Sequence, residues 1–111
     1  NKSAFNTHLS DDNFDYFSFQ NDRPFEVNKF QHFLSQQLPT NIFRGKGILW
    51  FQESPDRHIF QLSGPRYELQ ADDWTTDPKN ELVFIGRNLD KSLIKQQLNE
   101  CLASRGSNYD L

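Results

Sequence analysis

The apolar positions at the start of this chain follow two different periods. Residues 14–20, FDYFSFQ, alternate in part between apolar and polar side chains, which predicts a β-strand. Pro24 stands where a helix can begin, and Pro39 ends the helical pattern. Between these prolines, apolar residues recur at helical spacing: Val27, Phe30, Phe33, Leu34 and Leu38. We therefore expect a strand followed by a helix with one apolar face.

Strand patterns dominate the middle of the chain. Residues 42–52 predict a second strand, which the turn SPD ends. The segments HIFQLS at 58–63 and RYELQA at 66–71 flank Gly64-Pro65, an arrangement typical of a β-hairpin. The unbroken apolar run LVFI within residues 81–87 predicts a central strand that is covered on both faces.

A second helix is expected at the end of the patterned region. Asp90 is a good N-cap residue, and Leu89 and Ile94 are spaced as a hydrophobic staple across the first turn. The buried stripe of this helix is predicted to contain Ile94, Leu98, Cys101 and Leu102.

The predicted order is β-α-β-β-β-β-α, or β-α-β-β-β-α if the hairpin strands are counted differently. This order predicts a two-layer α+β domain, in which a mostly antiparallel sheet of four to five strands carries two helices on one face. Residues 14–104 would form this domain. Residues 1–13 are polar and patternless, so we expect a disordered or frayed linker remnant, and residues 105–111 a loose tail.

Length and composition restrict the class of protein. The chain has 111 residues, enough for one domain, and its eleven phenylalanines predict an aromatic-rich core. It has no apolar run that could cross a membrane and no signal-peptide pattern. A single cysteine suits a reducing compartment, so we expect a cytoplasmic protein. Because the chain starts at Asn1 and has no methionine, we also expect a fragment of a longer protein.

The stretch RGKGILWF at residues 44–51 is similar to the sheet motif of RNA-recognition domains, K/R-G-F/Y-G/A-F-V-x-F/Y. However, the third and fifth positions should be aromatic to stack on bases, and here they are Lys46 and Ile48. The net charge of −3 also disfavours nucleic acid as a partner. Gly45-Lys46-Gly47 lacks the spacing of a phosphate-binding loop. These departures disfavour nucleic-acid binding. A stand-alone sheet domain that binds single-stranded nucleic acid is kept only as the alternative interpretation.

Successive side chains of the strand predicted at residues 42–52 point to opposite faces of the sheet. We expect Gly45 and Gly47 to lie beneath the helices, on one face with Phe43, Leu49 and Phe51. The other face would carry Ile42, Arg44, Lys46, Ile48 and Trp50. Arg44, Lys46 and Trp50 are therefore the candidate partner-contact residues. A solvated face with a packed tryptophan is the competing interpretation.

Side chains that could carry chemistry are scattered. The three histidines, His8, His32 and His58, lack metal-ligand spacing with one another or with Cys101. We expect His32 to be exposed and Cys101 to be a buried, inert thiol. The loop acids Asp72, Asp73 and Asp77 fit turn formation better than a calcium loop, and Trp74 is expected to anchor that loop. The sequence thus predicts no catalytic, cofactor-binding or metal-binding residue.

Several motifs occur in a characteristic order. They are RGKGILW at 44–50, Trp74 followed by Asp77-Pro78, ELVFIG at 81–86, Leu89-Asp90 and Cys101-Leu102, with Arg23-Pro24-Phe25 before the first helix. Together they resemble the C-terminal domain of the CobW family over residues 14–103, and DPKNELVFIG is the most specific string.

The resemblance implies a parent protein that is a P-loop GTPase in metal handling, for cobalamin synthesis or zinc delivery. That parent would use GTP, Mg and a transition metal such as Zn or Co. The family's nucleotide site and CxCC metal motif lie in an N-terminal GTPase domain, and neither motif occurs in this sequence. Many members have a His-rich linker before this domain, where this sequence has only His8.

For this chain, the resemblance implies a non-catalytic regulatory or protein-interaction domain. Its partners would be the N-terminal GTPase domain of the same protein and a metalloprotein client, with no nucleic acid and no membrane. We also expect the exposed sheet to self-associate when its partner is removed, because a large apolar patch rarely stays bare.

Overall fold

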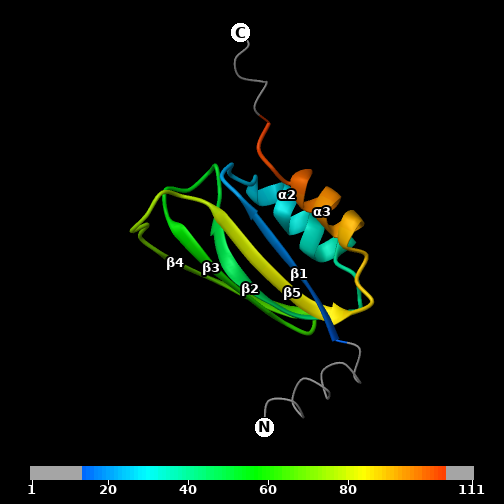
Figure 1. Ribbon diagram of the computed structural model, residues 1–111. Helices are drawn as coiled ribbons and strands as arrows, with labels where there is room; N and C mark the ends of the chain where they lie inside the picture. Colours follow the sequence, from blue (N-terminus) through cyan, green and yellow to red (C-terminus); the bar gives the residue numbers. More distant parts are fainter. Residues whose placement is uncertain (1–13, 105–111) are drawn as a thin grey trace.

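The computed structural model describes residues 14–104, so the expected linker with His8 and the expected tail lie outside the described residues. The described residues form one antiparallel sheet of five strands in the order β1-β5-β2-β3-β4. Helices α2 and α3 lie together on one face of this sheet (Figure 1). The elements are β1 Phe14–Asn21, α2 Val27–His32, η1 Phe33–Gln37, β2 Ile42–Trp50, β3 Arg57–Ser63, β4 Arg66–Asp72, β5 Asn80–Arg87 and α3 Lys91–Asn99.

This architecture confirms the predicted two-layer α+β class. The order of elements is β-α-β-β-β-β-α, with the hairpin supplying two strands of its own. None of the helices between residues 14 and 104 is long and apolar enough to cross a membrane.

The first helix begins later than its sequence pattern indicates. Pro24 does not open it, because the next residue, Phe25, forms β-bridges to two other segments, at Phe51 and at Leu102. The N–H of Phe25 donates to the carbonyl of Trp50 at 2.9 Å, and the carbonyl of Phe25 accepts from Gln52 at 2.9 Å. Helix α2 starts only at Val27 and continues into the π-helical turn η1. The expectation of a single regular helix from Pro24 was therefore wrong at its start and in its last turn.

The core between the helices and the sheet is built largely from phenylalanine, as the composition predicts. Phe25, Phe30, Phe33, Phe60 and Phe84 are all fully buried. Phe30 lies at the centre of this cluster, with its ring centroid 5.2 Å from that of Phe25 and 5.7 Å from that of Phe60. Because Phe30 comes from α2 and Phe60 from β3, these ring contacts fix the helix layer on the sheet.

Strand β2 departs from simple alternation at its first residues. Its register against β5 shifts between Ile42 and Arg44, which marks a β-bulge. As a result Ile42 is 4% exposed and belongs to the core, whereas Phe43 is 37% exposed. The predicted faces of these two residues were therefore wrong, and the rest of the strand follows the prediction.

The two glycines of β2 lie on the helix side, as expected. A Cβ atom at Gly45 would lie 2.7 Å from the ring of Phe84 in the core. A Cβ atom at Gly47 would lie 1.9 Å from the carbonyl oxygen of Glu81 on β5. Gly47 thus allows two strand backbones to approach closely, which no side chain would permit.

Candidate interaction face

The helices leave one face of the sheet uncovered by any other described element. This open face is formed in its central part by Arg44, Lys46, Ile48, Ile59, Val83 and Ile85. Strand β5 shows the contrast between the two faces, because Leu82 and Phe84 are buried under the helices while Ile85 is 40% exposed. The prediction that the LVFI run is covered on both faces was wrong for the part of the chain that the structure describes.

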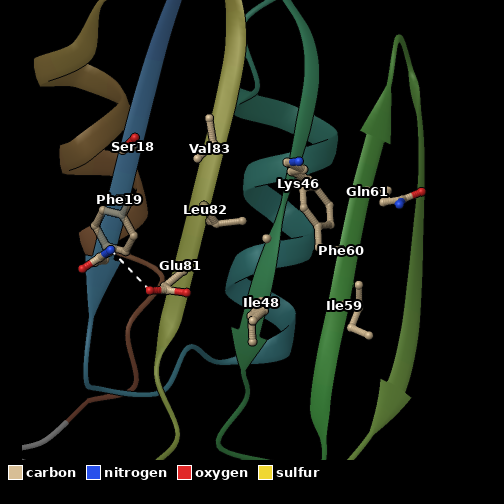
Figure 2. Close-up of a pocket in the computed structure, with 12 residues that line it drawn as sticks. Ser18, Phe19, Lys46, Ile48, Ile59, Phe60, Gln61, Glu81, Leu82 and Val83 are labelled. Carbon is tan, nitrogen blue, oxygen red and sulfur yellow. Dashed lines mark hydrogen bonds between the residues drawn. The ribbon is translucent and has the colours of Figure 1, made fainter.

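Apolar side chains occupy the middle of the open face. Ile48 on β2 lies opposite Ile59 on β3, and Lys46 lies opposite Val83 on β5. Between these strands a shallow depression of about 420 Å³ extends over the sheet. Figure 2 shows Val83, Lys46, Ile48 and Ile59 projecting from three neighbouring strands along it. This shallow, largely apolar depression is suited to contact with another surface and is not an enclosed active-site pocket.

The three candidate partner-contact residues lie together on this face. Arg44 and Lys46 are exposed, and Trp50 is half-buried at the far end of β2. Arg44 lies opposite Ile85, and Trp50 lies opposite Arg57 on β3. The shared face agrees with the predicted alternation, while contact with a partner stays a prediction.

Most acids of the open face already have cationic partners. Asp72 accepts two hydrogen bonds from the guanidinium of Arg57, at 2.7 and 2.6 Å. These hydrogen bonds lower the pKa of Asp72 below its usual range. Glu81 pairs with Lys79 at 3.3 Å. Within residues 14–104, Arg44 and Lys46 form no ion pair, so the centre of the open face is positively charged and favours an acidic partner surface.

One cation and two aromatic rings form a cluster at one end of the sheet that the sequence did not predict. The guanidinium of Arg87 lies 5.3 Å from the ring centroid of Phe14 and 5.5 Å from that of Phe43. Tyr16, next to this cluster, is 63% exposed. Alternation in β1 and β5 gives the faces of Phe14 and Arg87, but Phe43 reaches this face only through the bulge in β2. The proximity of the three side chains also depends on a strand order that the sequence pattern does not contain.

The other candidate groups do not form a reactive site. Cys101 is 2% exposed, which confirms its predicted burial, and this burial raises the pKa of its thiol to about 12. His32 is exposed, as expected, and the ring of His58 packs against Phe51 at 5.2 Å. No group of three metal-ligating side chains is found among residues 14–104.

The carboxylates of Asp72, Asp73 and Asp77, at the end of β4 and in the loop after it, do not converge on one site. Asp72 is engaged by Arg57, whereas Asp73 and Asp77 are exposed in the turn region. Trp74 is half-buried within this loop. The placement of these residues agrees with turn formation.

Residues 14–104 thus form a small α+β domain whose described helices all lie on one side of the sheet. Comparison of its sequence with protein families gives a match to the family described as "Cobalamin synthesis protein cobW C-terminal domain" over residues 14–102. The chain therefore belongs to the CobW C-terminal domain family, as the motifs around residues 44–50 and 81–86 predict.

Two solved structures have a similar fold. The crystal structure of Zn(II)-bound YjiA GTPase from E. coli matches with a TM-score of 0.73 and 21% identity, covering 86% of this chain and 32% of that chain. A Zn(II)-bound triple mutant of YjiA GTPase matches with a TM-score of 0.72 and 22% identity, covering 82% and 30% respectively. The chain thus spans about a third of the length of these structures.

Proposed function

We propose that this chain is a non-catalytic regulatory or protein-interaction domain of a CobW-like metal-chaperone GTPase. Membership of the CobW C-terminal domain family supports this proposal. The similar YjiA chains are named as GTPases and are about three times longer than the matched region. GTP, Mg and a transition metal such as Zn or Co would then be bound by the rest of the parent, an N-terminal GTPase domain. The parent would act in cobalamin synthesis or zinc homeostasis, in the cytoplasm.

The observation that carries the proposal is the uncovered, partly apolar face of the sheet. Val83 and Ile85 interrupt the polar side chains of β5 on that face, and Ile48 and Ile59 continue the apolar strip over β2 and β3. An apolar strip of this kind on one face of a sheet indicates that another surface covers it. We propose that the GTPase domain of the same protein provides this surface, with a metalloprotein client as the second partner.

Each candidate residue would have a separate role in this contact. Arg44 and Lys46 would orient an acidic surface and raise the rate of association. Trp50 would supply a large buried area at one end of the contact. Nucleotide or metal would regulate the contact only if the GTPase domain offers different surfaces in its two states.

Binding between separately produced domains tests this proposal. The 111-residue chain is titrated with the GTPase domain of its parent, as the native chain and with alanine at Arg44, Lys46 and Trp50. We expect the triple substitution to weaken binding at least about tenfold, because it removes two cations and an aromatic anchor.

The matched control for this titration lies on the helix side. Leu93 is 41% exposed on α3 and Lys95 is also exposed, so their double alanine variant removes one apolar side chain and one cation from the opposite face. It should bind like the native chain. Equal affinity of the native chain and the open-face variant would show that this face does not contact the GTPase domain.

A further inference from the structure

Strand β4 forms an unpaired edge of the sheet among the described residues. It is last in the strand order and pairs only with β3. All seven of its residues are exposed, on both faces. On the helix side Tyr67 is 43% and Leu69 is 39% exposed. Figure 1 shows β4 at the edge of the sheet that lies away from α2 and α3.

The edge has a regular geometry that permits pairing. The β3–β4 hairpin has a two-residue turn with Gly64 at φ 61° and Pro65, and its register runs without a bulge from Ser63↔Arg66 to Arg57↔Asp72. In a two-residue hairpin, alternate residues of each strand turn their N–H and C=O groups outward. Tyr67, Leu69 and Ala71 therefore present these groups at the free edge. Proline and bulges, which blunt many natural edges, are absent within β4.

The sequence of β4, RYELQAD, is complementary to itself in one antiparallel register. With Leu69 opposite Leu69 of a second copy, Arg66 lies opposite Asp72 and Glu68 lies opposite Gln70. Tyr67 lies opposite Ala71, so a large side chain meets a small one. Opposite charges across a strand pair stabilise it, whereas like charges destabilise it.

The neighbouring registers bring like charges together. A register centred on Glu68 places two glutamates opposite each other. A register centred on Gln70 places Glu68 opposite Asp72. The charges of β4 thus favour the register centred on Leu69 and disfavour its two neighbours. They do not oppose edge pairing in every register.

We propose that β4 pairs with β4 of a second copy of this chain, antiparallel and with a two-fold axis at Leu69. The side chain of Asp72 is still 44% exposed beside Arg57, so Arg66 of the second copy could approach the same carboxylate. Leu69 and Tyr67 would gain the apolar cover that the helices do not give them. This inference is independent of the proposed GTPase partner.

The symmetry of this pair has a functional consequence. A two-fold axis perpendicular to the sheet keeps both helix layers on one side and both open faces on the other. The dimer would therefore present two copies of Arg44, Lys46 and Trp50 on one continuous sheet. A partner that is itself dimeric would bind this doubled surface with higher avidity than a single domain.

Disulfide cross-linking tests the register directly. In the proposed pair, residue 69 is the only position of β4 that faces itself, so the Leu69→Cys chain should form a disulfide dimer under mild oxidation. The Tyr67→Cys chain is the matched control, because Tyr67 has similar exposure on the same side but lies opposite Ala71. The native Cys101 is buried and should not contribute. We expect Leu69→Cys to cross-link at least about tenfold faster.

Sedimentation equilibrium of the chain without added cysteines tests the association itself. The Arg66→Glu substitution would place a second carboxylate opposite Asp72 at both ends of the strand pair, so we expect dimerisation to weaken about tenfold. Lys95→Glu on α3 makes the same change in net charge away from β4 and should leave dimerisation unchanged. Equal cross-linking at positions 67 and 69, or a chain that remains monomeric at millimolar concentration, would overturn the proposal. A chain whose β4 edge is covered by another segment or by a different protein would also remain monomeric and would overturn the proposal.

Discussion

At the residue scale, Asn80 connects three segments through its buried amide. Its Oδ1 accepts a hydrogen bond from the N–H of Trp50 at 2.7 Å. Its Nδ2 donates to the carbonyl of Arg23 at 2.7 Å and to Oδ1 of Asn21 at 2.9 Å. Because Asn80 is fully buried, water cannot replace these partners when the amide is removed.

Asn80→Ala should therefore lower the free energy of unfolding by about 2–4 kcal/mol, since it leaves several polar groups unpaired. Urea denaturation followed by tryptophan fluorescence gives this quantity. Asn99→Ala, at an exposed position at the end of α3, is the control and should change the free energy of unfolding by less than about 0.5 kcal/mol. A similar effect of both substitutions would argue against the structural role of Asn80.

Asp15 gives the fold a pH-dependent contact. Its carboxylate lies 3.0 Å from Nζ of Lys91 and accepts the N–H of Leu89 at 3.1 Å. The hydrogen bond from Lys91 is the main reason that its pKa falls below the usual 3.8, with the N–H of Leu89 adding to the effect. Because the folded-state pKa is the lower one, the stabilisation is present above the unfolded pKa and is lost as the pH falls through the folded pKa.

Asp15→Asn should consequently destabilise the domain at neutral pH and lose its effect in acid. Denaturation of the native and variant chains at about pH 7 and about pH 2 measures this difference. Asp73→Asn, which changes an exposed loop carboxylate without an ion pair in the described residues, should show no comparable trend. A native-to-variant difference that stays constant down to the lowest pH would contradict the linkage between Asp15 and Lys91.

At the element scale, α3 shows how much local sequence alone could predict. Asp90 was predicted as the N-cap, and its Oδ1 accepts the N–H of Leu93 at 3.2 Å. Leu89 and Ile94 are both buried in the same cluster, as the staple spacing requires. These contacts lie within one helical turn, so the sequence contains the information that determines them.

Asp90→Ala should lower the free energy of unfolding by about 1 kcal/mol, because the N–H of Leu93 loses its acceptor. Thermal denaturation monitored by circular dichroism would measure this loss. Lys95→Ala keeps the cap and replaces an exposed residue of the same helix, so it should change the stability by only a few tenths of a kcal/mol. Equal melting temperatures for Asp90→Ala and the native chain would show that the cap contributes nothing.

Contacts between distant segments explain where sequence patterns failed. The bulge that exchanges the faces of Ile42 and Phe43 arises where the carbonyl of Asn41 accepts the N–H of Arg87 at 3.0 Å. A Cβ atom at Gly86 would lie 2.0 Å from that same carbonyl oxygen, so the approach requires glycine. Residues 41 and 86 are far apart in the sequence, and no period of apolar residues predicts their contact.

At the scale of the whole molecule, the sequence correctly predicted both helices on one face of the sheet, but it wrongly predicted that β5 is covered on both faces. The apolar run in β5 predicted cover on both sides, and α2 and α3 supply it on one side only (Figure 1). Ile85 is 40% exposed as a result. The sequence of β5 is explained if another surface of the proposed parent protein covers its second face, which is the central claim of the proposed function.

Metal-dependent GTP hydrolysis by the proposed GTPase parent tests that claim most directly. The hydrolysis rate is compared for three proteins. They are the native parent, a truncated parent that lacks the domain beginning at Phe14, and a parent with alanine at Arg44, Lys46 and Trp50. We predict that truncation changes the rate or its response to metal, and that the open-face variant changes it in the same direction. The Leu93→Ala, Lys95→Ala control should hydrolyse GTP like the native parent. Identical rates and metal responses in all versions would contradict a regulatory contact through the open face.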